Sequence, residues 1–232
     1  MILIQKPQIS TFSPCAYLPD REWRFEYFFA MDLNEGELEE LLARGWRKFG
    51  AYFFRPQCGE CRECIPIRVR VSEFNASRSH RRILKKGSDI AVKFGPLEYR
   101  DEIYEIYRIH SLDRFGRETD RDEFISSFYT RSCPSLQSEY FINEKLAAVG
   151  FLDKSGEALS SVYFVFDTTY GEYRLGSLSI LKEIEQALTM NLKYYYLGYY
   201  IRDNHSMAYK NLFHLNEKYD WLNNIWSGEK SR

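Results

Sequence analysis

Three cysteines recur at every third position in Cys58-x-x-Cys61-x-x-Cys64, and this spacing carries the clearest chemistry in the chain. A short loop of this kind can turn three thiolates toward one metal ion or cluster. Structural zinc sites usually use two separated pairs of ligands, whereas three close cysteines and one remote cysteine are a common iron–sulfur arrangement. With Cys15 as the fourth ligand, the sequence predicts an iron–sulfur cluster or zinc at Cys15, Cys58, Cys61 and Cys64. Reduced thiols without a metal are the alternative, and Cys133 stands apart as a bystander.

Basic residues are concentrated in one stretch of a chain that is almost neutral as a whole. The 232 residues have a formal net charge of −1, but residues 44–96 hold thirteen Lys or Arg against four Asp or Glu, a local charge of +9. Such an asymmetry is typical of proteins that bind a phosphate-bearing partner. A solvated basic face that pairs with acidic parts of the same molecule is the alternative.

The composition is that of a globular chain with a substantial core, because 44% of the residues are hydrophobic and 17% are aromatic. No apolar run approaches the roughly 18 residues that span a bilayer, and residues 1–7 lack the pattern of a signal peptide. Five cysteines, an odd number, fit a reducing compartment better than a disulfide scaffold. We therefore expect a cytoplasmic protein that makes no membrane contact.

The elements that must position the cysteines and the basic stretch lie in the first half of the chain. Sequence patterns predict strands at 23–31, 46–55 and 67–71, a helix at 35–43 and a basic helix near 79–86. Asn34 is a strong N-cap for the first helix, and Gly45 ends it. The Gly95-Pro96 pair marks a change in pattern, so we expect a small basic, cysteine-bearing module at residues 1–96.

The second half changes from helices to strands. It contains helical patterns at 98–110, 120–130 and 178–190 and strand patterns at 139–142, 146–152, 160–166 and 194–199. Asn143-Glu144 is typical of a hairpin turn, and the last helix and strand form a parallel crossover. We expect an α+β fold with a mixed sheet in a second module at residues 97–232.

Nine blocks of the sequence, in order, resemble the arginyl-tRNA protein transferase family, in particular its bacterial leucyltransferases. They are CAYLP at 15–19 with Arg24, GWRKFG at 45–50, FRP at 54–56, the cysteine loop, SRSHRR at 77–82, LSSVY at 159–163, LGS at 175–177, YLGYYI at 196–201 and MAYK at 207–210. The resemblance covers roughly residues 15 to 221. Asp20 and Tyr200 depart from the Gly and Trp usual in the family, at positions that need not do chemistry.

This resemblance implies that leucine passes from leucyl-tRNA to the α-amine of proteins that begin with Asp or Glu, which marks them for the degradation machinery. It also implies that the C-terminal half is similar to GCN5-related acetyltransferases. An aminoacyl ester is already activated, so neither ATP nor CoA is expected. The acceptor α-amine has a pKa of about 7.7–8.0 and needs only mild base assistance. Catalysis then depends on positioning and on stabilising the oxyanion.

The resemblance places the reaction centre in the late blocks. Tyr199 is expected to donate a hydrogen bond to the oxyanion or to the leaving ribose oxygen, and Lys210 to give electrostatic support. An aromatic core strand and a surface lysine are the alternative interpretation of these two residues.

Two further sets of residues are expected to bind the substrates. On the basic helix several side chains share one face, and a helix N-terminus can hold phosphate, so the residues expected to contact tRNA are Arg78, Arg81, Arg82, Lys85, Lys86, Gly176 and Ser177. A solvated helix and an ordinary Ser N-cap are the alternatives. The acidic acceptor side chain needs a cation, ideally a guanidinium, and the candidates are Arg24, Arg55, Arg174 and Arg202.

Other functions stay open on the sequence alone. The same reaction could use arginyl-tRNA, or the protein could be an acetyl-CoA-dependent N-acetyltransferase or a non-catalytic RNA-binding protein with a metal-sensing loop. The four histidines show no triad-like or metal-like spacing, and no G-x-S-x-G, H-E-x-x-H or complete phosphate-loop motif occurs.

Overall fold

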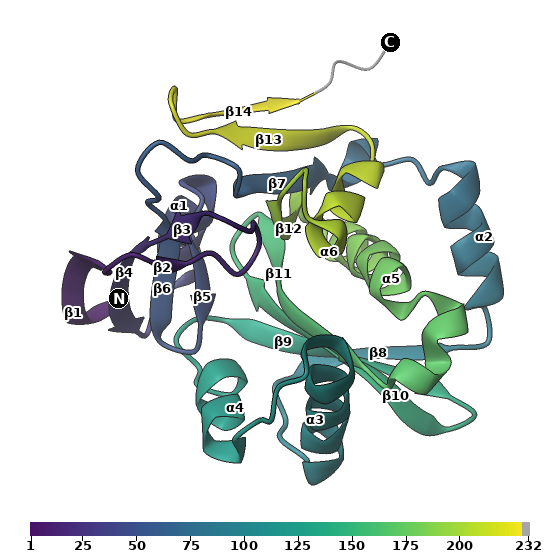
Figure 1. Cartoon of the computed structure of the whole chain (residues 1–232). Helices are drawn as coiled ribbons and strands as arrows, with labels where there is room; N and C mark the ends of the chain where they lie inside the picture. The colour runs from purple at the N-terminus through teal and green to yellow at the C-terminus, as the bar shows by residue number, and fades with distance from the viewer. Residues whose placement is uncertain (229–232) are drawn as a thin grey trace.

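A computed structural model describes residues 1–228, in which a large mixed sheet is flanked by helices and by a smaller sheet (Figure 1). The strands are β1 (Ile2–Ile9), β2 (Ser13–Pro14), β3 (Glu22–Trp23), β4 (Phe25–Met31), β5 (Arg47–Phe49), β6 (Tyr52–Pro56), β7 (Ile65–Arg70), β8 (Ala91–Pro96), β9 (Ser135–Ile142), β10 (Lys145–Lys154), β11 (Ala158–Phe166), β12 (Tyr194–Tyr200), β13 (Asn216–Asp220) and β14 (Ile225–Gly228). The helices are α1 (Glu35–Ala43), α2 (Arg78–Lys86), α3 (Asp101–Phe115), α4 (Arg121–Phe128), α5 (Leu175–Thr189) and α6 (His205–Ala208), with short 3-10 turns η1 (Val71–Glu73), η2 (Thr168–Tyr173) and η3 (Tyr209–Leu212).

The large sheet has the strand order β14-β13-β7-β12-β11-β10-β9-β8, and the smaller one β1-β4-β6-β5. In the large sheet, within residues 1–228, only β11 and β12 pair in parallel, and α5 connects them, as the sequence predicts. Asn143 and Glu144 have φ of 49° and 64° and form the predicted hairpin turn between β9 and β10. The predicted α+β class with a mixed sheet is confirmed.

The capping residues place the first two helices where the sequence predicts them. The Asn34 side chain accepts a hydrogen bond from the Glu37 backbone amide at 2.9 Å and opens α1, and Gly45 with φ of +80° follows its end. Ser77 caps α2 in the same way through the His80 amide. The predicted strand at 46–55 is instead a hairpin of β5 and β6, which turns at Gly50.

The two predicted modules share one sheet. β7 lies between β12 and β13 and is antiparallel to both, and β8 pairs with β9. Both β7 and β8 belong to residues 1–96, yet their partners belong to residues 97–232. The large sheet is therefore built from both halves of the chain.

Helices and the smaller sheet bury the large sheet through three hydrophobic clusters. α5 packs on β11 and β12, with Leu178 and Tyr195 in the cluster between them. α3 packs on β10 and β11 around Phe151 and Val165, and α1 joins the smaller sheet to Tyr196 of β12. None of the helices among residues 1–228 combines the length and the apolar composition that crossing a membrane requires.

Candidate functional site

The parallel pairing of β11 and β12 stops early, and this is where the candidate site begins. Residues 158–160 pair with residues 194–196, but β11 continues to Phe166 without β12 beside it. The next four residues of β11 are half-buried, whereas residues 158–160 are buried. In β12 the register against β7 shifts between Tyr196 and Gly198. Irregularities of this kind, where parallel strands separate, commonly lie next to ligand sites.

Arg47 of β5 reaches this point from the smaller sheet. Its Nη1 donates a hydrogen bond to Ser160 Oγ at 3.0 Å, and its Nη2 donates to the Ser161 carbonyl oxygen at 2.7 Å. Burial lowers the pKa of the guanidinium, although not enough to discharge an arginine. Asp153 contributes a nearby negative charge, but its carboxylate pairs with Lys48 at 3.1 Å. Within residues 1–228 Arg47 therefore has no carboxylate partner of its own.

Lys210 of η3 approaches from the opposite end of the chain. Its Nζ donates to the Tyr199 carbonyl oxygen at 3.1 Å and contacts Met207 Sδ at 3.3 Å. Burial, and secondly the positive charge of Arg47, lower the pKa of this amine to about 7. An amine that is substantially neutral near pH 7 can accept a proton from a reacting group.

Gly198 lets the two cations come together. A Cβ built on this residue would lie 3.2 Å from Lys210 Nζ and 3.4 Å from Arg47 Nη2, and the φ of Gly198 is +94°. Any other residue at position 198 would therefore have a strained backbone, and its side chain would occupy the space between Lys210 Nζ and Arg47 Nη2. The site thus combines β5, β12 and η3, which are far apart in the sequence.

Tyr199 lies beside this cluster, but its hydroxyl points elsewhere. The hydroxyl donates to the Gly45 carbonyl oxygen at 3.0 Å, and burial raises its pKa far above the usual range. Its one proton is already engaged by the backbone. Tyr199 contacts Lys210 through its carbonyl oxygen, so the structure brings the two predicted residues together without freeing the Tyr199 hydroxyl for an oxyanion.

The four arginines expected to bind the acceptor carboxylate lie in different settings. Arg24 donates through Nε to the Gln57 carbonyl oxygen at 2.8 Å, and Arg55 pairs with Glu26 at 2.6 Å. Arg174 precedes α5 in a left-handed conformation and is exposed, as is Arg202. Arg55 already has a carboxylate, which argues against it as a binder of another.

The predicted tRNA-binding residues lie on two neighbouring helices (Figure 1). All five basic residues are exposed on α2: Arg78, Arg81, Arg82, Lys85 and Lys86. Gly87, directly after α2, is so close to Leu178 of α5 that a Cβ would lie 2.8 Å from its side chain. Gly176 and Ser177 are half-buried in the first turn of α5, which begins at Leu175. The alternative of Ser177 as an N-cap is therefore wrong.

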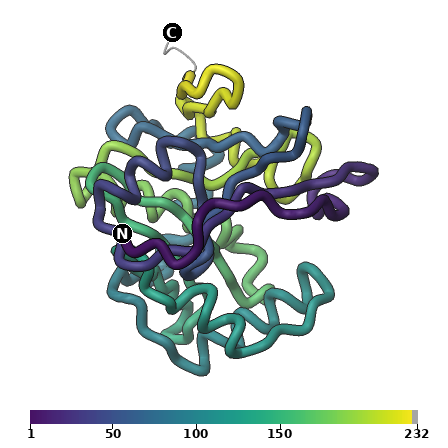
Figure 2. The backbone as a smooth tube through the Cα atoms, turned by 90° about the vertical axis from the view of Figure 1, so that its left-hand side faces the viewer, coloured from purple at the N-terminus to yellow at the C-terminus, as the bar shows by residue number. Residues whose placement is uncertain are grey.

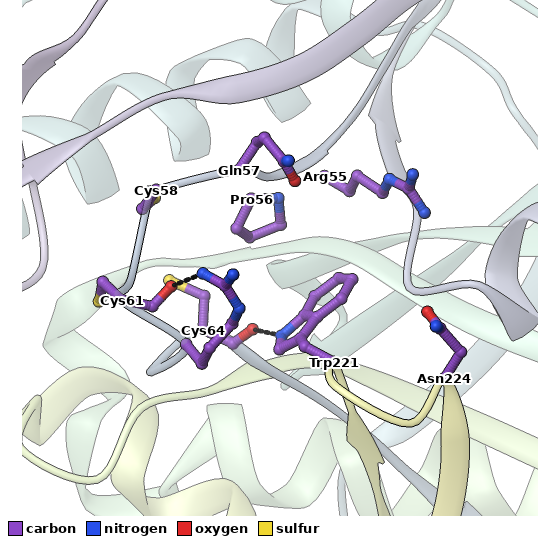
Figure 3. Close-up of a pocket in the computed structure, with 9 residues that line it drawn as sticks. Arg55, Pro56, Gln57, Cys58, Cys61, Cys64, Trp221 and Asn224 are labelled. Atoms are coloured by element: carbon purple, nitrogen blue, oxygen red, sulfur yellow. Dashed lines mark hydrogen bonds between the residues drawn. The ribbon is translucent and has the colours of Figure 1, made fainter.

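The cysteine loop lines a cavity of about 190 Å³ (Figure 3). Its lining residues are Arg55, Pro56, Gln57, Cys58, Cys61, Arg62, Cys64, Trp221 and Asn224. The Trp221 indole donates to the Cys64 carbonyl oxygen at 3.0 Å and closes one side. Cys15 belongs to the β2–β3 segment, part of the purple chain that projects from the body in Figure 2. Arg21 of that segment donates to Cys61 Sγ at 3.4 Å.

The four predicted ligand cysteines are neighbours. The pKa of Cys64 is raised to about 12, first by burial and then by the negative charges of Cys58, Cys15 and Cys61, in that order. Four neighbouring thiols have the donor chemistry of a thiolate-bound metal site. In the part of the chain that the structure describes, however, no three Cys, His, Asp or Glu side chains are spaced as ligands of one metal ion.

Comparison with known proteins classifies the chain. The N-terminal and C-terminal family models of arginine-tRNA-protein transferase match residues 13–82 and 100–220. The chain belongs to the arginine-tRNA-protein transferase family. It is 35% identical over 206 residues to an aspartate/glutamate leucyltransferase of Helicobacter hepaticus, covering 86% of each chain, and 37% identical to one of Alcanivorax borkumensis, covering 86% and 84%. The family predicted from the sequence blocks is confirmed, and the protein is a transferase that uses aminoacyl-tRNA.

Solved structures are more distant from this member of the arginine-tRNA-protein transferase family. L-PGS from Bacillus licheniformis aligns with a TM-score of 0.47 at 10% identity, over 79% of this chain and 55% of that one. FemX aligns with a TM-score of 0.47 at 8% identity, over 69% and 59%.

Arg47 is the site residue that the sequence does not single out. It stands within the GWRKFG block that carries the family resemblance, but no feature of the block distinguishes it from Arg44 or Lys48. In the structure Arg44 is exposed and Lys48 is paired with Asp153, whereas Arg47 is partly buried and has no carboxylate partner among residues 1–228. Only the approach of β5 to β11 shows this.

Proposed function

We propose that this transferase moves leucine from leucyl-tRNA to the α-amine of proteins whose first residue is Asp or Glu. The observation that carries the proposal is the Lys210 amine, with its pKa of about 7, beside the Arg47 guanidinium at the end of the β11–β12 pairing. A base of this strength matches an acceptor amine whose own pKa is about 8. Relatives at 33–37% identity that are named for aspartate/glutamate leucyl transfer support leucine over arginine as the donor.

In this reaction the α-amine nitrogen attacks the carbonyl carbon of the leucyl ester. Neutral Lys210 takes the proton that the nitrogen must lose, and the carbonyl oxygen carries the negative charge of the tetrahedral intermediate. The bond from carbon to ribose oxygen then breaks, and that oxygen gains a proton. The products are deacylated tRNA and a protein one leucine longer, so neither ATP nor CoA is consumed.

The basic helix α2 and the first turn of α5 are suited to the tRNA. Arg78, Arg81, Arg82, Lys85 and Lys86 are exposed together, and Lys86 also pairs with Glu172 at 3.1 Å. Exposed cations on one helix bind phosphates without reading sequence. The start of α5 near Gly176 can hold a further phosphate, with the Ser177 hydroxyl as an additional donor, whereas the Ser177 backbone amide already donates to the Arg174 carbonyl oxygen at 2.9 Å.

The decisive experiment supplies purified protein with charged leucyl-tRNA and peptides that begin with Asp, Glu or Ala. Mass spectrometry should show leucine added to the Asp and Glu peptides, and replacing leucyl-tRNA with arginyl-tRNA should remove the product. Ribonuclease should abolish transfer, and acetyl-CoA should not replace tRNA. Absence of product with any charged tRNA would contradict the proposal.

We also propose that Cys15, Cys58, Cys61 and Cys64 hold an iron–sulfur cluster or zinc. Their proximity and the adjoining Arg21 and Arg62 support a negatively charged thiolate centre. Anaerobic purification followed by iron and zinc analysis should find metal in the protein and less of it in Cys61→Ser. A metal-free protein of full activity would show that no metal is required.

The product would be read by the cellular degradation machinery in the cytoplasm. A reporter that begins with Asp should be short-lived in cells that contain this protein and stable in cells that lack it. A reporter that begins with Ala serves as the control. Equal lifetimes of the Asp reporter in both cells would argue against this consequence of the transfer.

A further inference from the structure

We propose that Arg47 binds the side-chain carboxylate of the acceptor's first residue and so determines the preference for Asp and Glu. The inference rests on the proposed function and adds to it the specificity residue. None of the four arginines predicted from the sequence is the one that we assign.

The first argument is charge. Arg47 and Lys210 are partly buried next to one another, and among residues 1–228 neither has a carboxylate within ion-pair distance. Partly buried cations are normally paired, because leaving water costs them solvation. By contrast, the neighbouring Lys48 and Arg68 are paired with Asp153 and Glu217. Within residues 1–228, a guanidinium without a carboxylate partner lies beside an amine of lowered pKa, and this arrangement is suited to an anion that arrives with a substrate.

The second argument is geometry. The Arg47 guanidinium is fixed by Ser160 and Ser161, and these two hydrogen bonds use only two of its five N–H groups. The Lys210 amine meets it across Gly198. In an N-terminal Asp or Glu, the α-amine and the carboxylate belong to the same small residue. One such residue can therefore place its amine at Lys210 and its carboxylate at Arg47.

The third argument is the effect of the bound carboxylate on the base. Burial is the larger cause of the lowered pKa of Lys210, and the charge of Arg47 lowers it further. A carboxylate bound to Arg47 offsets that charge, so Lys210 becomes a better proton acceptor when an acidic residue is in place. A neutral residue such as Asn leaves the charge of Arg47 in place beside Lys210. The preference for an acidic first residue then affects the rate of the chemical step as well as the affinity for the acceptor.

The test compares acceptor peptides that differ only in the first residue: Asp, Glu, Asn and Gln. In the wild type, kcat/KM should be highest for Asp and Glu. Arg47→Met should lower it for these two by about 100-fold, the size expected for losing a charged hydrogen bond, and lower it much less for the Asn and Gln peptides, so that the acidic preference is lost. Arg47→Lys should retain part of the acidic preference. An equal loss for acidic and neutral peptides, or an unchanged preference, would overturn the assignment.

A binding measurement without tRNA separates this inference from the proposed function. By calorimetry the wild type should bind an Asp peptide more tightly than its Asn counterpart, and Arg47→Lys should reduce the difference. This readout holds even if leucine is not the donor, whereas failure of transfer with a retained binding difference would refute only the proposed function. Arg108→Met, an exposed arginine of α3, is the matched control, and circular dichroism checks that each variant is folded. A binding preference that survives Arg47→Lys unchanged would reject Arg47.

Discussion

The protein carries its positive charge in two different settings. On α2 five cations stand in solvent, and the pair between Lys86 and Glu172 is 49% and 66% exposed. At the end of the β11–β12 pairing, Arg47 and Lys210 are partly buried and adjacent. Salt screens the first group, but it affects the second much less.

The exposed cations of α2 are suited to binding tRNA, whereas Arg47 and Lys210 are suited to the transfer reaction. Exposed charges raise the rate and affinity of binding to a polyanion, but they do not position a particular substrate atom. Arg47 and Lys210 are instead held by oxygen atoms of Ser160, Ser161 and Tyr199, and burial lowers the pKa of both groups. Variants in the two regions should therefore fail in different ways.

The largest effect is expected from Lys210→Met, which removes the proposed proton acceptor while keeping an unbranched side chain. The loss of kcat should be about 100-fold to 10,000-fold, the usual contribution of a general base. Single-turnover transfer from leucyl-tRNA measures it, with tRNA affinity as the control. Wild-type kcat in this variant would assign Lys210 a structural role only.

The pH dependence of kcat/KM also tests whether Lys210 is the base. Both Lys210, with a pKa of about 7, and the acceptor α-amine must be neutral, so activity should fall as the pH drops through 8 and 7. Well below pH 7 log kcat/KM should rise with a slope of about two in the wild type and about one in Lys210→Met. The same slope in both proteins would exclude Lys210 as the base.

Gly198→Ala should have a smaller but clear effect. The positive φ of Gly198 disfavours any side chain, at a cost of about 1–3 kcal/mol, and the new methyl group would press on Lys210 Nζ. We expect reduced thermal stability and a loss of about tenfold or more in kcat. Gly156→Ala, where a Cβ meets no atom within 4 Å, is the control and should retain activity. Equal behaviour of the two variants would show that Gly198 is not needed to bring the cations together.

The smallest effect on catalysis is expected on α2. The double variant Arg78→Gln/Arg82→Gln should weaken tRNA binding and lower the salt dependence of log K by about one for each phosphate that the variant no longer neutralises. At saturating tRNA its kcat should stay close to that of the wild type. Lys145→Gln, at an exposed hairpin, is the control. An unchanged salt slope would remove α2 from the tRNA-binding surface.

Local signals predicted much of the fold. The Asn34 and Ser77 caps, the Asn143-Glu144 turn and the crossover through α5 all depend on residues close together in the sequence, and the structure contains each of them. The sequence does not reveal the turn at Gly50, because the reason for a glycine there lies far away in the chain. A Cβ at position 50 would lie 2.1 Å from the carbonyl oxygen of Ser126 in α4.

The candidate site was harder to predict, because its groups come from separate segments. The sequence draws attention to Lys210 and Tyr199 through the family blocks, but it cannot show that the Tyr199 hydroxyl is engaged by Gly45. It also cannot show that Arg47 has no carboxylate partner within residues 1–228 and is held by Ser160 and Ser161 instead. Both facts follow from how β5 meets β11 and β12, which periodicity and composition do not encode.

The position of β7 inside the large sheet, between β13 and β12, has a consequence for synthesis of the protein. β7 is translated early, but its partners β12 and β13 lie more than 120 residues later, at residues 194–200 and 216–220. Pairing over such sequence separations slows folding and leaves strand edges exposed in the meantime. On the ribosome the early strand must wait until nearly the whole chain has emerged, and a protein truncated before β12 should be prone to aggregation.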